Sequence, residues 1–192
     1  MNGISRALLV AAVLVPGLSL AQQSRPQTQP LNYSYVELSY DETDFPAIDG
    51  DGFTVAGSIR LTDDWHAYAS YGTANLDLGV DFDSWAIGAG YRYGLNNHTD
   101  LYGRVLYIKS NFDVPGFGDR DDDGLGLQFR IRSRINDHLE VEGGVQYVNL
   151  DDSDTSLQAS ARYYFTNDFS AAIGITFGGD VDVLGVSARY SF

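Results

Sequence analysis

A two-residue alternation of apolar and polar side chains runs through most of this 192-residue chain. From residue 31 onward, ten segments carry uncharged, mostly aliphatic and aromatic residues at alternate central positions, and polar or small residues between them. Successive side chains of a β-strand point to opposite faces, so the pattern predicts strands with one apolar and one polar face. The expected strands span about 31–40, 52–61, 65–74, 82–94, 100–110, 124–135, 139–150, 156–165, 169–177 and 181–192.

The charged residues of these segments decide between a soluble and a membrane sheet. A soluble β-sandwich or lipocalin packs large aliphatic side chains inward and turns its charges to water. Here the polar face combines arginines and glutamates with many small residues, which suits the crowded, solvated lumen of a narrow barrel. We therefore expect the apolar face to contact lipid. The expected lumen charge network consists of Glu37, Arg60, Arg92, Arg104, Arg130, Arg132, Arg134, Glu140, Glu142, Arg162 and Arg189.

The connections between the expected strands differ in length. Short polar turns at 62–64, 95–99, 136–138 and 166–168 alternate with longer acidic connections at 41–51, 75–81, 111–123 and 151–155, while 178–180 is tight. Both termini then lie with the short turns, which requires an even number of strands. This predicts an all-β fold, a single transmembrane antiparallel up-and-down barrel over 31–192 with periplasmic termini and ten strands, or eight if the loop flanks are overread.

The N-terminal 30 residues have a different character. A short positively charged opening at 2–6, an apolar run at 7–15 and the small residues Ser19 and Ala21 are typical of a secretory signal peptide, predicted to span 1–21. Residues 22–30 are polar and contain two prolines, which predicts a flexible periplasmic tail.

Overall composition excludes several classes of function. The chain carries 12 Lys+Arg against 26 Asp+Glu, a formal net charge of −14, so nucleic acid is a poor partner. It contains no cysteine, which excludes disulfides, thiolate metal sites and a cysteine nucleophile.

The C-terminal residues 188–192, Ala-Arg-Tyr-Ser-Phe, resemble the signature strand of bacterial outer-membrane barrels, in which Tyr190 and Phe192 would be the assembly signal. The chain is similar in plan to the small OmpA/OmpX-like outer-membrane proteins. Residues 32–40, with Asp51-Gly52-Phe53 and Gly57-Ser58, resemble a ten-stranded small porin-like family within that group. The resemblance implies the bacterial outer membrane, contact with its lipid and lipopolysaccharide, and insertion by the barrel-assembly machinery. It implies no active site.

The lumen arginines allow two interpretations. Across the turn at Asp137, Arg134 falls opposite Glu140 and Arg132 opposite Glu142 on the lumen face. Such pairs can plug a narrow barrel and fix its register. Alternatively, uncompensated arginines form a constriction that favours anions.

An acidic run offers a candidate metal site. Asp119, Asp121 and Asp123 precede Gly124 in the D-x-D-x-D-G order that begins a calcium loop. The twelfth position is Arg130 rather than a glutamate, which excludes an EF-hand. The run could hold loosely bound Ca²⁺ or Mg²⁺, or simply be a solvated acidic loop; no other cofactor is expected.

An enzymatic function is not expected. The three histidines, His66, His98 and His138, fall in or beside the short turns, far from the acidic loops, and no nucleophile elbow, phosphate loop or His pair for a metal appears. The sequence therefore predicts a small porin-like or envelope-structural barrel with a narrow, Arg-lined, plugged lumen. The alternative is an adhesion or host-interaction barrel whose acidic extracellular loops bind an unknown partner or divalent cations.

Overall fold

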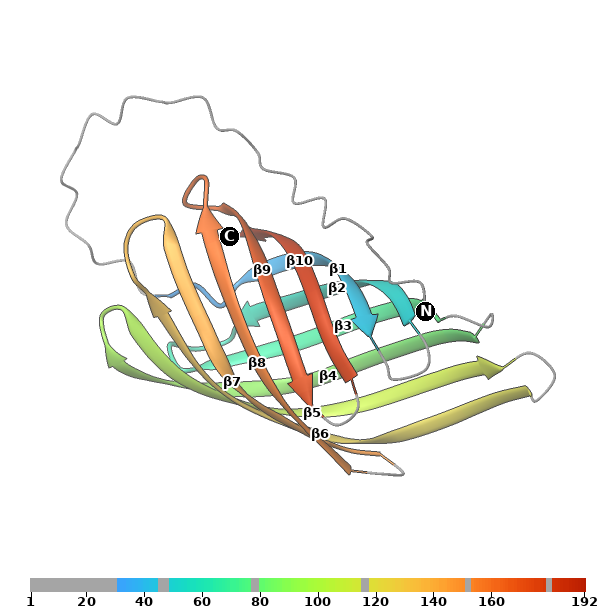
Figure 1. The fold of residues 1–192 in the computed structure, drawn as a ribbon. Helices are drawn as coiled ribbons and strands as arrows, with labels where there is room; N and C mark the ends of the chain where they lie inside the picture. The colour runs from blue at the N-terminus through green and yellow to red at the C-terminus, as the bar shows by residue number, and fades with distance from the viewer. Residues whose placement is uncertain (1–30, 45–48, 77–79, 115–117, 151–152, 179–180) are drawn as a thin grey trace, which may run out of the picture.

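The computed structural model describes residues 31–44, 49–76, 80–114, 118–150, 153–178 and 181–192. They form ten antiparallel strands in a closed barrel, in which each strand pairs with its sequence neighbours and β1 pairs with β10 (Figure 1). The strands are β1 Tyr35–Asp44, β2 Asp49–Arg60, β3 Trp65–Leu76, β4 Val80–Asn96, β5 Thr99–Val114, β6 Gly118–Arg134, β7 Leu139–Asn149, β8 Ser153–Tyr164, β9 Phe169–Gly178 and β10 Val181–Ser191.

The predicted ten-stranded antiparallel barrel is confirmed, and the eight-stranded alternative is wrong. The long acidic loops are a further error, because the strands continue through most of them: β5 reaches Val114 and β6 begins at Gly118. The first strand also begins later than expected, at Tyr35, and residues 31–34 turn into the barrel instead. The predicted signal peptide and tail, 1–30, lie outside the described residues.

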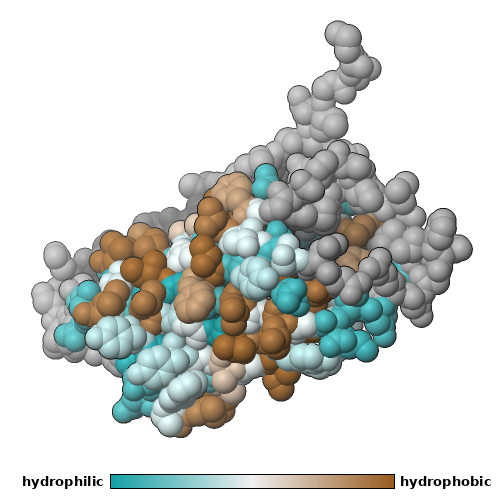
Figure 2. Space-filling view, turned by 90° about the horizontal axis from the view of Figure 1, so that it is seen from below, coloured by the Kyte–Doolittle hydropathy of each residue, from teal (hydrophilic) through white to brown (hydrophobic). Residues whose placement is uncertain are grey.

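The outer wall carries the apolar side chains. Val36, Ile87 and Ile173 are each at least half exposed, as are many other aliphatic and aromatic side chains on that face. Apolar and aromatic residues cover much of the wall seen in Figure 2. Contiguous exposed apolar surface of this extent is uncommon on a soluble monomer and marks contact with another apolar phase. The described residues contain no helix long and apolar enough to cross a membrane.

Aromatic residues on the outer wall lie in cross-strand pairs near both ends of the strands. Trp65 packs on Tyr91 beside the short turns, with ring centroids 5.1 Å apart, and Trp85 packs on Tyr107 nearer the other end, at 5.5 Å. The hydroxyl of Tyr107 donates to Asp123 at 3.0 Å. Tyrosine therefore stands where the outer face changes from apolar to acidic.

Candidate functional site

The lumen is the candidate site, and the segment before β1 occupies one end of it. In this pre-strand segment, residues 31–34, the side chains of Leu31 and Tyr33 are each 1% exposed. The backbone carbonyl of Leu31 accepts a hydrogen bond from Arg60, and that of Asn32 accepts one from Arg132 at 2.9 Å. The arginines of the wall thus hold the backbone of the segment inside the barrel.

Tyr33 is surrounded by rings and cations. Its ring lies 4.8 Å from that of His66 and 5.7 Å from that of Tyr102, measured between centroids. The guanidinium of Arg132 lies over the same ring at 5.2 Å and that of Arg92 at 6.0 Å. Cation–π contacts in a desolvated setting contribute up to about 2 kcal/mol each, so this packing fixes the pre-strand segment firmly.

Arg104 makes the contacts that cross the middle of the lumen. From β5 it donates to the hydroxyl of Tyr35 on β1 at 3.1 Å and to Nε2 of His66 on β3 at 3.0 Å. Because Nε2 of His66 accepts this hydrogen bond, its Nδ1 carries the ring proton of the neutral imidazole. The guanidinium also lies over the rings of Tyr68 and Tyr102.

Next to these contacts lies a layer of ion pairs, which we call the arginine layer. It comprises Arg130, Arg132, Arg134, Arg162, Arg189, Glu37, Glu140 and Glu142. Glu140, 2% exposed, is paired with Arg132 at 2.7 Å and with Arg134 at 3.6 Å. Glu37 accepts from both Arg162 and Arg189, and Glu142 from Arg130.

The predicted register of the 134–140 turn is confirmed: Arg132 is opposite Glu142 and Arg134 is opposite Glu140. The closest ion pairs, however, run diagonally. Arg132 pairs with Glu140 and Arg130 pairs with Glu142. The arginine side chain is long enough to contact the diagonal neighbour on the next strand, two residues away from the one directly opposite.

Glycines leave the space that these side chains fill. A Cβ at Gly90 would collide with the His66 imidazole and the Arg104 side chain, and one at Gly144 would collide with Arg130 and the backbone of Phe129. The inner face of these strands therefore has room for the Arg104 and Arg130 side chains only because Gly90 and Gly144 beside them have no side chain.

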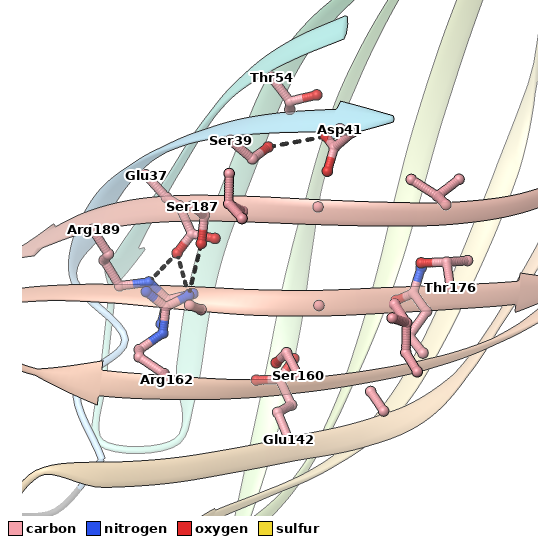
Figure 3. Close-up of a pocket in the computed structure, with 18 of the residues that line it drawn as sticks. Glu37, Ser39, Asp41, Thr54, Glu142, Ser160, Arg162, Thr176, Ser187 and Arg189 are labelled. Atoms are coloured by element: carbon pink, nitrogen blue, oxygen red, sulfur yellow. Dashed lines mark hydrogen bonds and ion pairs between the residues drawn. The ribbon is translucent and has the colours of Figure 1, made fainter. Parts of the chain in front are cut away.

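A cavity of about 290 Å³ lies beside the arginine layer, on the side of the lumen formed by β1 and β7–β10 (Figure 3). Its floor is formed by Glu37, Arg162 and Arg189. Its walls carry the charged side chains of Asp41, Arg130, Glu140 and Glu142 and the polar side chains of Ser39, Thr54, Gln158, Ser160, Thr176 and Ser187. Asp41 lies against Gly185 and accepts the hydroxyl hydrogen of Ser39.

The remaining arginines of the expected network lie at the end of the barrel that holds Phe192 and the short turns. Arg92 is paired with Asp100 at 2.9 Å, and Arg60 donates to the pre-strand segment. Sequence reasoning placed Asp100 at the first position of an expected strand but left it out of the lumen network, and it assigned Asp41 to a loop. Both side chains face the lumen. The sequence did contain a signal for this placement. Asp100 is an even number of residues from Arg104 on β5, and Asp41 is an even number of residues from Glu37 on β1, so each shares the lumen face with its partner.

The acidic run is a strand rather than a calcium loop. Asp119, Asp121 and Asp123 lie on β6 at alternate positions, about 6.6 Å apart, which is too open for a calcium loop. Asp121 pairs with Lys109 at 3.3 Å, and Asp123 accepts from Tyr107. The side chain of Asp119 lies outside the description, and no three potential metal ligands gather among the side chains that the structure describes.

The three histidines lie apart from one another. His66 is buried in the lumen rather than solvated in a turn, because Arg104 and Tyr33 enclose it. His98 lies at the β4–β5 turn, and Nδ1 of His138 is 3.0 Å from the carbonyl oxygen of Tyr164. That the chain is not an enzyme stays a prediction.

The C-terminal aromatic residues point outward. Tyr190 and Phe192 are both more than half exposed on the outer wall. The backbone of Phe192 is bound to the pre-strand segment: its N–H donates to the carbonyl of Ser34 at 3.1 Å, and its carbonyl accepts from the side chain of Asn32.

A comparison with protein families identifies this architecture. Residues 7–192 match the family model described as outer membrane protein beta-barrel domain. The chain belongs to this family. As an outer membrane protein β-barrel domain protein it is located in the bacterial outer membrane, as the resemblance in its sequence implied. No curated protein matches the sequence.

Among the solved structures similar to the chain, one supports the fold. The KdgM porin in complex with disordered oligogalacturonate aligns with a TM-score of 0.52 at 8% identity, covering 82% of this chain and 99% of the porin. The NanC porin aligns with a TM-score of 0.48 at 9% identity, covering 82% and 98%. Ail of Yersinia pestis aligns with a TM-score of 0.44 at 16% identity, covering 83% and 99%. The KdgM likeness concerns the fold alone.

Proposed function

We propose that this outer membrane protein β-barrel domain protein is an envelope-structural barrel whose narrow, Arg-lined lumen is plugged. The observation that carries the proposal is the pre-strand segment, with Leu31 and Tyr33 buried inside the barrel and its backbone bound by Arg60 and Arg132. Beyond it, Arg104 bridges to Tyr35, and the arginine layer binds β1 to β8 and β10. Three successive sets of contacts obstruct the path of a solute.

In this proposal the strands cross the membrane, and lipid and lipopolysaccharide cover the apolar outer wall. An arginine or lysine on that wall at the bilayer midplane would cost about 2–4 kcal/mol, which accounts for its lack of central charges. The aromatic pairs Trp65–Tyr91 and Trp85–Tyr107 would lie at the two interfaces. The pre-strand segment and Phe192 lie with the short turns, which are periplasmic in barrels of this kind.

The test is conductance of the refolded barrel in a planar bilayer. We expect no steady current from the unmodified protein. Discrete current steps should appear when Tyr33→Ala is combined with Arg104→Ala and Arg189→Ala, because each substitution removes a side chain from one of the three sets of contacts. Tyr93→Ala removes an aromatic side chain from the outer wall, where Tyr93 is 61% exposed, and serves as the control that stays closed. Steady current through the unmodified barrel would refute the proposal.

A second candidate function is binding of an extracellular partner, and the length of three strands favours it. β4, β5 and β6 have 17, 16 and 17 residues, against 10 to 12 in the other strands. They extend beyond their neighbours at the end of the barrel opposite Phe192 and the short turns (Figure 1). The outer face of this extension carries Asp81, Asp83, Asp113, Asp121 and Asp123. Replacing these residues with asparagine should abolish adhesion of cells without changing the amount of folded barrel; unchanged adhesion would exclude this candidate.

A further inference from the structure

We propose that the cavity beside the arginine layer is a blind pocket that binds a small oxyanion, a carboxylate or phosphate group, at Arg189 and Arg162. This goes beyond the closed-barrel function, because a cavity inside a closed barrel can bind a solute without conducting it. At about 290 Å³ it lies at the lower end of the size range of ligand sites, so it suits a small solute.

The charge balance of the floor supports an anion. Five arginines of the arginine layer, Arg130, Arg132, Arg134, Arg162 and Arg189, share three glutamates, Glu37, Glu140 and Glu142. The two excess arginines are divided between Glu140, which pairs with Arg132 and Arg134, and Glu37 at the cavity floor. There Arg162 and Arg189 converge on the same oxygen of Glu37 (Figure 3). Two guanidinium groups held together on one carboxylate oxygen attract a second anion.

Arg189 also has hydrogen-bond donors to spare. Its Nε donates to Glu37, and its guanidinium lies over the ring of Tyr35 with 3.8 Å between Cζ and the ring centroid. Among the described residues, no acceptor receives a hydrogen bond from either of its terminal nitrogens. A guanidinium stacked by its face keeps its N–H edge free, and that edge matches the two oxygens of a carboxylate or phosphate.

The walls of the cavity supply neutral polar partners. Hydroxyl groups of Ser39, Ser160, Thr176 and Ser187 line it, and Ser187 already accepts from Arg162. Of the other carboxylates that line the cavity, Glu140 is paired with Arg132 and Glu142 with Arg130. Asp41 lies four residues along β1 from Glu37 and therefore about 13 Å away at strand spacing. Asp41 disfavours a second negative group there, while it accepts hydrogen bonds from the hydroxyl groups of a ligand anchored at the floor.

The experiment is titration calorimetry on the full barrel in detergent at low salt, with gluconate and inorganic phosphate as probes. Glucitol has the same carbon chain as gluconate without the carboxylate and is the neutral control. We expect gluconate or phosphate to bind and glucitol to give no heat. Binding of one anion alone identifies its group as the preferred one. Equal binding of gluconate and glucitol, or no binding of either anion, would overturn the proposal.

Variants separate the site from the general positive charge of the lumen. Arg189→Gln should weaken anion binding at least tenfold. Arg92→Gln removes the same charge at the far end, beside Asp100, and should leave binding within twofold. Because Arg189→Gln could impair folding, Ser187→Asp provides a second variant: its new carboxylate pairs with Arg162 and should abolish binding while the barrel stays heat-modifiable on gels. Undiminished binding in Ser187→Asp would refute the assignment.

Discussion

The guanidinium of Arg104 donates a hydrogen bond to the hydroxyl of Tyr35, 3.1 Å away, although three strands separate β5 from β1 along the wall. Both side chains are buried. This contact ties nearly opposite sides of the barrel together and fixes the distance between them.

Tyr35→Phe tests the strength of that tie. A hydrogen bond to a charged group contributes about 1.5–3 kcal/mol, and its loss also leaves an Arg104 N–H without its acceptor, so we expect the free energy of unfolding to fall by that amount. Urea unfolding in lipid vesicles measures it. Tyr93→Phe, on the outer wall, should change stability by less than about 0.5 kcal/mol; an equal loss in both variants would contradict the role of the contact.

Glu140→Gln tests the arginine layer. Glu140 is buried with Arg132 and Arg134, and removal of one partner of a buried pair costs about 3–5 kcal/mol because the remaining charges lose their counter-ion. The same unfolding measurement should show this loss. Asp121→Asn breaks the exposed pair with Lys109 and should cost less than about 1 kcal/mol. A small change in the free energy of unfolding of Glu140→Gln would mean that water solvates Arg132 and Arg134 in place of the carboxylate.

Gly90→Ala tests the close packing around His66. The new methyl group would collide with the imidazole and with Arg104, and overpacking of this kind costs about 1–3 kcal/mol. Gly57 is the matched control, because a Cβ there meets only the carbonyl of Tyr35 at 3.9 Å. Thermal unfolding should therefore distinguish Gly90→Ala from Gly57→Ala, and equal midpoints would show that His66 moves freely.

Ile173→Arg tests whether the outer wall lies in lipid. Ile173 is 54% exposed near the middle of β9, so an arginine there should cost about 2–4 kcal/mol in vesicles. Leu61→Arg, beside the β2–β3 turn, should cost about 0–1 kcal/mol because it lies at the interface. If the two variants unfold with the same free energy in vesicles, residue 173 does not lie in the hydrocarbon.

The strands and their faces could be predicted from the sequence because a barrel wall is governed by one local rule, the alternation of residues between lipid and lumen. Val36 and Glu37 show it directly: one is exposed on the wall and the other is paired in the arginine layer. The same rule, together with the short turn between β6 and β7, also predicted that Arg132 lies opposite Glu142.

The contacts across the lumen could not be predicted in this way. Asn32 binds Phe192 and Arg132, residues far away in the chain, and no periodic signal records such contacts. Residues 31–34 show the same alternation as the strand that follows. The sequence therefore predicts that the first strand begins at residue 31, although this segment leaves the sheet. The extensions of β5 after Lys109 and of β6 before Asp123 were missed for a related reason. Their outer face carries acidic instead of apolar residues, so a rule that recognises strands by alternating apolar residues assigns them to a loop.

The pairing of β1 with β10 joins the two ends of the folded chain, and the pre-strand segment is fastened to the last residue of the protein. The seam therefore cannot form until the final strand has arrived, and the pre-strand segment gains its contacts with Phe192 only then. A chain shortened at its C-terminus would lose the closure of the wall and an anchor of its interior in the same step.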